Sequence, residues 1–139
     1  MATKIRDIMT APPRTVSPET DIVTVARTMR DDDIGAELVT DGDELRGIVT
    51  DRDLVVRGIA AGGDPGKIKV GDVVSGVTAT IGPDDSLERA AQIMRERAVR
   101  RLPVVEDGHP VGIVSLGDLA IEKDDDSALA DISAARSNT

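Results

Sequence analysis

The segment GIVTDRDL at residues 47–54 is the best guide to the architecture, because it returns as GIVSLGDL at residues 112–119, which is 65 positions later. At that same shift, residues 4–54 align with residues 69–119 without a gap, and 13 of the 51 aligned pairs are identical. Many of the other pairs exchange one aliphatic residue for another. One constant spacing with a preserved hydrophobic rhythm indicates that the chain was built twice from one unit.

Each copy is only about 50 residues long, which is too short to bury a sufficient core by itself. We therefore expect the two copies to pack against each other around a pseudo-twofold axis, as one module within 139 residues. We assign residues 1–61 to motif 1, 62–68 to a linker, 69–123 to motif 2 and 124–139 to an acidic, flexible C-terminal tail.

The same order of elements is predicted in both copies, which gives an α/β (α+β) fold. A helical turn precedes a short strand, an amphipathic helix, a two-stranded hairpin and a closing helix. In the first copy these segments are 5–9, 15–18, 21–32, 37–50 and 51–61. In the second copy they are 70–74, 80–83, 86–97, 102–115 and the helix that Ser115 opens.

The composition excludes several classes of function. The chain contains no Phe, Tyr, Trp or Cys, and His109 is its single histidine, so disulfides, thiolate nucleophiles and cysteine zinc sites are excluded. The net charge of −9 disfavours nucleic acid as a partner, because phosphate backbones are bound by clustered Lys and Arg. No segment approaches the ~18 apolar residues that a membrane span needs. We expect a soluble, cytoplasmic protein that holds no metal and is not an enzyme.

The repeated endings, together with the openings IRDIMT at residues 5–10 and VGDVVS at residues 70–75, resemble the CBS-motif family. This family is named after cystathionine β-synthase, and two of its motifs pair into a Bateman module. The resemblance covers residues 4–121, and TDRDLVVRGIAAGGDP at residues 50–65 is similar to stand-alone two-motif proteins of the hypoxic response type. It implies a three-stranded sheet with two helices in each motif, clefts that bind adenosine derivatives, and frequent formation of homodimers.

The family's nucleotide signature is a Gly, two apolar residues, a Thr or Ser, two variable residues and an Asp, and both motifs contain it. A hydroxyl and free N–H groups at a helix start favour a phosphate, and a carboxylate can accept hydrogen bonds from two ribose hydroxyls. The resemblance also implies that the first strand of each motif contacts adenine through its backbone. The candidate binding residues are therefore Thr15, Thr50, Arg52, Asp53, Thr80, Arg101, Ser115 and Asp118.

The same signature has a second interpretation. Thr-x-x-Asp and Ser-x-x-Asp before an apolar run are also capping boxes, so Asp53 and Asp118 could serve only to start a helix. The second motif has Leu116 and Gly117 in place of an acid and an arginine, and Arg100 and Arg101 could replace the lost charge. In the first motif, Glu37 would repel a phosphate if it pointed inward.

Two functions remain. The first is a non-catalytic regulatory module that senses AMP, ADP, ATP or S-adenosylmethionine, needs no cofactor, and signals to a protein partner. The alternative is a ligand-free dimeric interaction scaffold or stress-response module whose clefts are filled by its own side chains. The intact TDRD at residues 50–53 favours the first, whereas Glu37, Leu116 and Gly117 favour the second.

Overall fold

The computed structural model describes residues 3–123, so the predicted tail at residues 124–139 lies outside the described residues. Contacts divide the chain into two compact units, which are described separately. We call Arg14–Val77 the first unit, and Met1–Pro13 together with Thr78–Thr139 the second unit.

The first unit is built on a sheet of four strands in the order β1-β2-β3-β4. The strands are β1 (Thr15–Val16), β2 (Ala36–Asp41), β3 (Glu44–Thr50) and β4 (Ser75–Gly76). β1 runs parallel to β2, and the other two pairs are antiparallel. The predicted hairpin is therefore confirmed, and Gly42, with φ of +61°, occupies the left-handed conformation that its turn requires.

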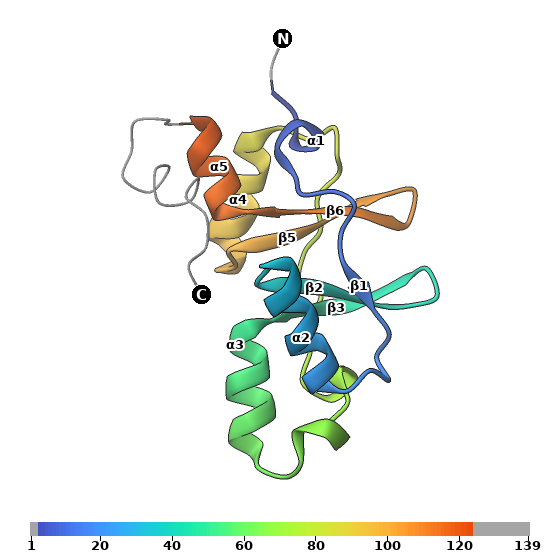
Figure 1. Ribbon diagram of the computed structural model, residues 1–139. Helices are drawn as coiled ribbons and strands as arrows, with labels where there is room; N and C mark the ends of the chain where they lie inside the picture. Colours follow the sequence, from blue (N-terminus) through green and yellow to red (C-terminus); the bar gives the residue numbers. More distant parts are fainter. Residues whose placement is uncertain (1–2, 124–139) are drawn as a thin grey trace. The chain divides into compact units, whose positions relative to one another are not determined.

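Two helices share the core of the first unit with β2 and β3, and Figure 1 shows the second of them continuing from the end of β3. Helix α2 (Ile22–Asp32) begins where the side chain of Asp21 accepts the Thr24 N–H at 2.9 Å. The second helix begins as α3 (Asp51–Asp53), widens into a π-helical segment at Leu54–Gly58, and tightens into a 3₁₀ turn that ends before Gly62. Gly58 allows a close approach, because a Cβ there would lie 2.7 Å from Ile22 Cδ1. A further 3₁₀ turn spans Pro65–Lys67.

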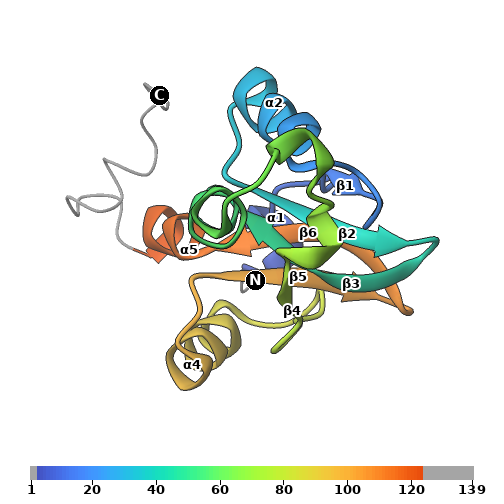
Figure 2. The same ribbon diagram turned by 90° about the horizontal axis from the view of Figure 1, so that it is seen from below.

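The second unit repeats this plan around the hairpin of β5 (Arg101–Glu106) and β6 (His109–Ser115). Figure 2 shows α4 (Leu87–Arg97) and α5 (Leu116–Lys123) beside that hairpin. Residues 80–83 were predicted to form a strand. In the structure only Ile81 pairs with the hairpin, through one parallel bridge to Val104.

Each unit has an aliphatic core, as a chain without aromatic residues requires. The buried core residues of the first unit are Ile22, Val25, Met29, Val39, Val49, Leu54, Val70 and Val73. Those of the second unit are Ile5, Ile81, Leu87, Ala90, Ile93, Met94, Leu102, Val104, Val114 and Leu119.

Each unit includes the helical turn that opens the other motif. Helix α1 (Ile5–Ile8) belongs to the second unit, where the Arg6 N–H donates to the Pro83 carbonyl at 2.8 Å. The 3₁₀ turn Val70–Asp72 belongs to the first unit, where the Gly71 N–H donates to the Pro18 carbonyl at 2.9 Å. The openings of the two motifs are therefore exchanged, at positions related by the same shift of 65 residues.

Candidate functional site

The first signature forms a complete capping box at the junction of β3 and α3. The Thr50 N–H donates to Asp53 Oδ2 at 2.9 Å, and the Asp53 N–H donates to the Thr50 hydroxyl oxygen at 3.1 Å. The structure therefore brings Thr50 and Asp53 together, as both interpretations of the motif require.

The remaining oxygen of Asp53 has partners from outside the signature. The Ser75 hydroxyl, on β4, donates to Asp53 Oδ1 at 3.2 Å, and Arg57 Nε lies 3.8 Å from the same oxygen. Asp53 is only 7% exposed. Its nearly buried carboxylate is therefore surrounded by three donors, which are the Thr50 N–H, the Ser75 hydroxyl and the Arg57 guanidinium. Neither Ser75 nor Arg57 was among the predicted site residues.

The second signature forms the same capping box at the start of α5. The Ser115 N–H donates to Asp118 Oδ2 at 2.8 Å, and the Asp118 N–H donates to the Ser115 hydroxyl oxygen at 3.1 Å. Asp118 is only partly buried, whereas Asp53 is buried.

The predicted arginines lie beside the caps in different ways. Arg52 is exposed within α3, next to the first cap. Arg101 lies at the start of β5 and pairs with Ser115 across the hairpin, which places it next to the second cap. The corresponding position in the first unit is Ala36, which pairs with Thr50. Each unit therefore has one of the predicted arginines near its cap, on a different element.

The two predicted threonines are exposed and stand apart from the capping networks. Thr15 pairs with Leu38 in β1, and Thr80 precedes the bridge residue Ile81. Within residues 3–123, no hydrogen bond joins either threonine to Asp53 or Asp118.

Glu37 points into the first unit. It is 2% exposed, pairs with Val49 across the β2–β3 ladder, and occupies the position of the core residue Leu102 in the second unit. Its Oε2 has no hydrogen-bond partner among the described residues. Burial raises the pKa of Glu37 to about 7; nearby Arg14 lowers the pKa and Asp32 raises it further. Arg14 and Asp32 form an ion pair at 2.8 Å.

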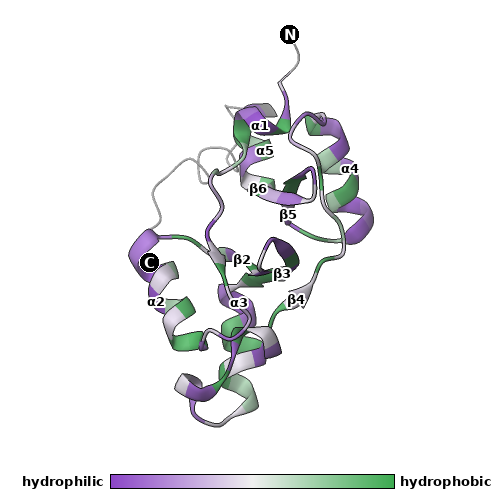
Figure 3. Cartoon of the chain, turned by 90° about the vertical axis from the view of Figure 1, so that its right-hand side faces the viewer, coloured by the Kyte–Doolittle hydropathy of each residue, from purple (hydrophilic) through white to green (hydrophobic). Residues whose placement is uncertain are grey.

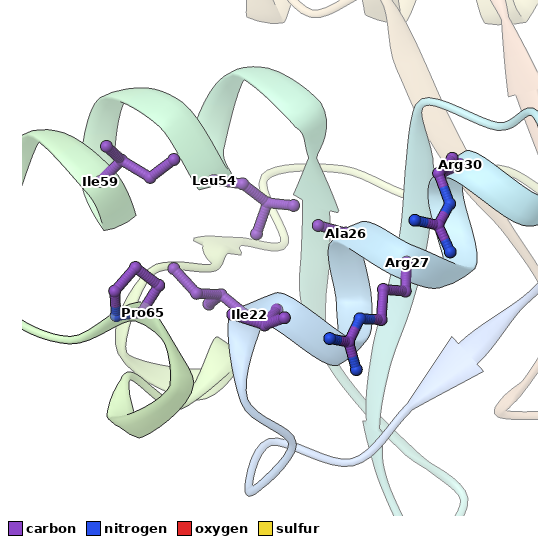
Figure 4. Close-up of a pocket in the computed structure, with 8 residues that line it drawn as sticks. Ile22, Ala26, Arg27, Arg30, Leu54, Ile59 and Pro65 are labelled. Carbon is purple, nitrogen blue, oxygen red and sulfur yellow. The ribbon is translucent and has the colours of Figure 1, made fainter.

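A groove with a volume of about 350 Å³ lies elsewhere on the first unit (Figure 4). Its walls are mostly aliphatic, and Arg27 and Arg30 stand on the α2 side. The lining residues are Ile22, Val23, Ala26, Arg27, Arg30, Leu54, Ile59 and Pro65. None of these was predicted to form a site. The sequence feature that could have indicated this groove was the apolar face expected for α2. On that face Val25 is buried, whereas Ala26 is exposed.

Within residues 3–123, no three His, Cys, Asp or Glu side chains gather in an arrangement that could hold a metal ion. In the same part of the chain, none of the helices combines the length and the apolar character that a membrane crossing requires.

Comparisons with known proteins identify the repeat. The protein-family model of the CBS domain matches residues 5–58 and again residues 70–124 of the sequence. The chain is 40% identical over 119 residues to the CBS domain-containing protein YhcV of Bacillus subtilis, covering 86% of this chain and 84% of that protein. It is 37% identical over 119 residues to hypoxic response protein 1 of Mycobacterium tuberculosis, covering 85% and 83%.

The fold agrees with these relatives. The crystal structure of hypoxic response protein I, determined with two coordinated zinc ions, superposes with a TM-score of 0.76 at 37% identity, covering 85% of this chain and 97% of that one. Stand-alone proteins of this kind are generally regulatory modules without catalytic activity. The chain belongs to the CBS-domain family and consists of two tandem CBS domains.

Proposed function

We propose that this protein is a non-catalytic regulatory module that senses an adenosine-containing ligand, such as AMP, ADP, ATP or S-adenosylmethionine. The observation that carries the proposal is the capping geometry, which is repeated in both units with a hydroxyl and a carboxylate at matching positions. A ligand changes the protein only as far as its affinities for two states differ. The response then passes to a protein partner.

The chemistry of the cap residues fits a nucleotide. The hydroxyls of Thr50 and Ser115 would contact phosphate, and Arg52 and Arg101 would add charge-assisted hydrogen bonds to the same group. The carboxylates of Asp53 and Asp118 would accept the ribose hydroxyls. Thr15 and Thr80 belong to the segments that would lie along the base.

Absorbance gives a first test of this proposal. A chain without Phe, Tyr, Trp or Cys has almost no near-ultraviolet absorbance, so a band at about 260 nm in a preparation free of nucleic acid would reveal a bound base. Titration calorimetry with AMP, ADP, ATP and S-adenosylmethionine then measures the affinity of each ligand.

The double variant Asp53→Asn, Asp118→Asn tests the assigned site. Asp53 and Asp118 are the third helical residues of their capping boxes, and the side-chain oxygen of asparagine can still accept the N–H of Thr50 or Ser115, so the helix starts should persist. We expect nucleotide affinity to fall at least about tenfold, because a hydrogen bond to a charged group is lost at each site, while the melting temperature changes little. Unchanged affinity would remove both carboxylates from the site.

A ligand-free dimeric scaffold is the second candidate, and the surface of the first unit favours it. Val55, Val56 and Ile59 are 57%, 48% and 59% exposed. They follow one another along the helix that starts at α3, where hydrophobic residues are visible in Figure 3, and Ile59 also lines the groove beside α2. Adjacent exposed aliphatic residues are typical of interaction sites, and we propose that a second copy of the chain covers them.

A further inference from the structure

The internal repeat allows the two cap carboxylates to be compared atom by atom. In both units the capping interaction uses the same oxygen, because Oδ2 of Asp53 and Oδ2 of Asp118 each accept the backbone N–H of the cap residue. The difference between the units lies in the second oxygen, Oδ1.

Oδ1 of Asp53 is already occupied. It accepts the Ser75 hydroxyl at 3.2 Å and lies 3.8 Å from Arg57 Nε. With its side chain only 10% exposed, Asp53 has little room for a further donor.

At the matching positions in the second unit, neither side chain donates to Asp118. Position 75 corresponds to Thr10, which joins Ile113 through two backbone hydrogen bonds of 2.9 and 3.1 Å. Position 57 corresponds to Glu122, whose carboxylate accepts the Thr3 hydroxyl at 3.1 Å. Within residues 3–123, Oδ1 of the partly exposed Asp118 takes part in no hydrogen bond and no ion pair.

We infer that the second unit holds the tighter ribose site, at Asp118, and that Ser75 and Arg57 set this preference by occupying Asp53. The inference rests on the proposed function and deepens it, since it decides which carboxylate receives the sugar. A ribose at Asp53 has to replace the Ser75 hydrogen bond and displace Arg57, whereas at Asp118 it meets an oxygen without a partner. Exchanging one hydrogen bond for another gains little net affinity, whereas adding one to a charged group gains roughly tenfold or more.

Titration calorimetry with AMP, and with 2′,3′-dideoxy-AMP as the control ligand, tests this preference. We expect the wild-type chain to bind one AMP tightly, and Asp118→Asn to weaken that binding about tenfold or more. The control ligand lacks both ribose hydroxyls, so its affinity should be low and should not respond to Asp118→Asn.

The double variant Ser75→Ala, Arg57→Gln should open the first unit. A second AMP of comparable affinity should then bind, and adding Asp53→Asn should abolish it. The matched control is Thr10→Ala, Glu122→Gln, which changes the same two positions of the second unit and should leave the stoichiometry at one. Thermal melts of each variant verify that it is folded.

The outcomes separate this inference from the proposed function. Two equivalent AMP sites in the wild-type chain, tight binding that survives Asp118→Asn, or an opened variant that still binds one AMP would each overturn the inference while leaving nucleotide sensing intact. If none of AMP, ADP, ATP and S-adenosylmethionine bound to any folded variant, the proposed function would be rejected together with the inference.

Discussion

At the scale of single residues, Glu37 is the least expected feature of the chain. A carboxyl group occupies a core position that the second motif fills with Leu102, and one of its oxygens is buried without a partner. Burying a charge without pairing it is costly, so the group holds its proton instead. Arg14 and Asp32, the charged groups that act on it, oppose each other and leave burial as the dominant cause.

This environment predicts that stability falls as the pH rises. Because burial raises the pKa of Glu37 from 4.5 to about 7, the folded chain keeps a proton that the unfolded chain has already released. The contribution of the Glu37 proton to the free energy of unfolding is complete below about pH 4.5 and is lost as the pH rises to about 7. The free energy of unfolding should fall by up to roughly 3 kcal/mol over this range.

Urea denaturation at several pH values checks this prediction. Glu37→Gln cannot ionise at this position, so the stability difference between variant and wild type should grow in the variant's favour between about pH 4.5 and pH 7. Glu37→Leu, which copies the second motif, should behave in the same way. Parallel stability curves would show that Glu37 titrates with an ordinary pKa.

The caps illustrate what can be predicted at this scale. A spacing of three predicted Asp53 and Asp118 as cap residues, whereas the family resemblance implied their role as ligand residues. The structure confirms the caps, because a capping box is formed locally. The role of Ser75 could not be predicted, because it lies 22 positions from Asp53 and only the pairing of β4 with β3 brings it there.

At the scale of elements, the short strand β4 depends on a glycine in β3. A Cβ at Gly47 would overlap the Ser75 carbonyl oxygen and would lie 2.7 Å from Val74 Cγ2. At the matching Gly112, the nearest atom is Sδ of Met9, within a flexible side chain, at 2.6 Å, and the nearest backbone atom is the Thr10 carbonyl oxygen at 3.0 Å. The two repeats therefore share a close approach but differ in how easily it can relax.

We predict that Gly47→Ala destabilises the fold more than Gly112→Ala. The first change pushes against backbone and should cost about 2 to 3 kcal/mol, whereas a methionine side chain can move aside and should limit the second cost to about 1 kcal/mol. Denaturant unfolding measures both. Gly76→Ala, which would meet nothing within 4 Å, is the control and should be close to neutral. The reverse order would contradict the assigned close approach.

At the scale of the whole molecule, the proposed homodimer concerns the exposed residues after α3. Val55→Asp together with Ile59→Asp places two charges on the surface that a second copy is proposed to cover, so sedimentation should show a shift from dimer to monomer. Val77→Asp changes an apolar residue that is 38% exposed and follows β4 instead of lying on this helix, and should leave the dimer intact. A wild-type chain that sediments as a monomer at micromolar concentration would refute the proposal.

The sequence by itself determined the repeat, the order of elements and both capping boxes. These features depend on neighbours within a few residues or on one constant shift, so hydrophobic spacing and cap residues are sufficient to predict them. The amphipathic helices predicted at residues 21–32 and 86–97 agree with α2 and α4 for this reason.

Three features became visible only in the folded chain: which unit each helical turn joins, how deeply Glu37 is buried, and which donors reach Asp53. The turn at Val70–Asp72 has the same local sequence pattern whichever strands it packs on. The sequence around Glu37 likewise does not reveal whether its side chain lies on the buried or the exposed face of the sheet. These outcomes depend on contacts between residues far apart in the chain, and the free energy of packing, which has no local signature, selects among them.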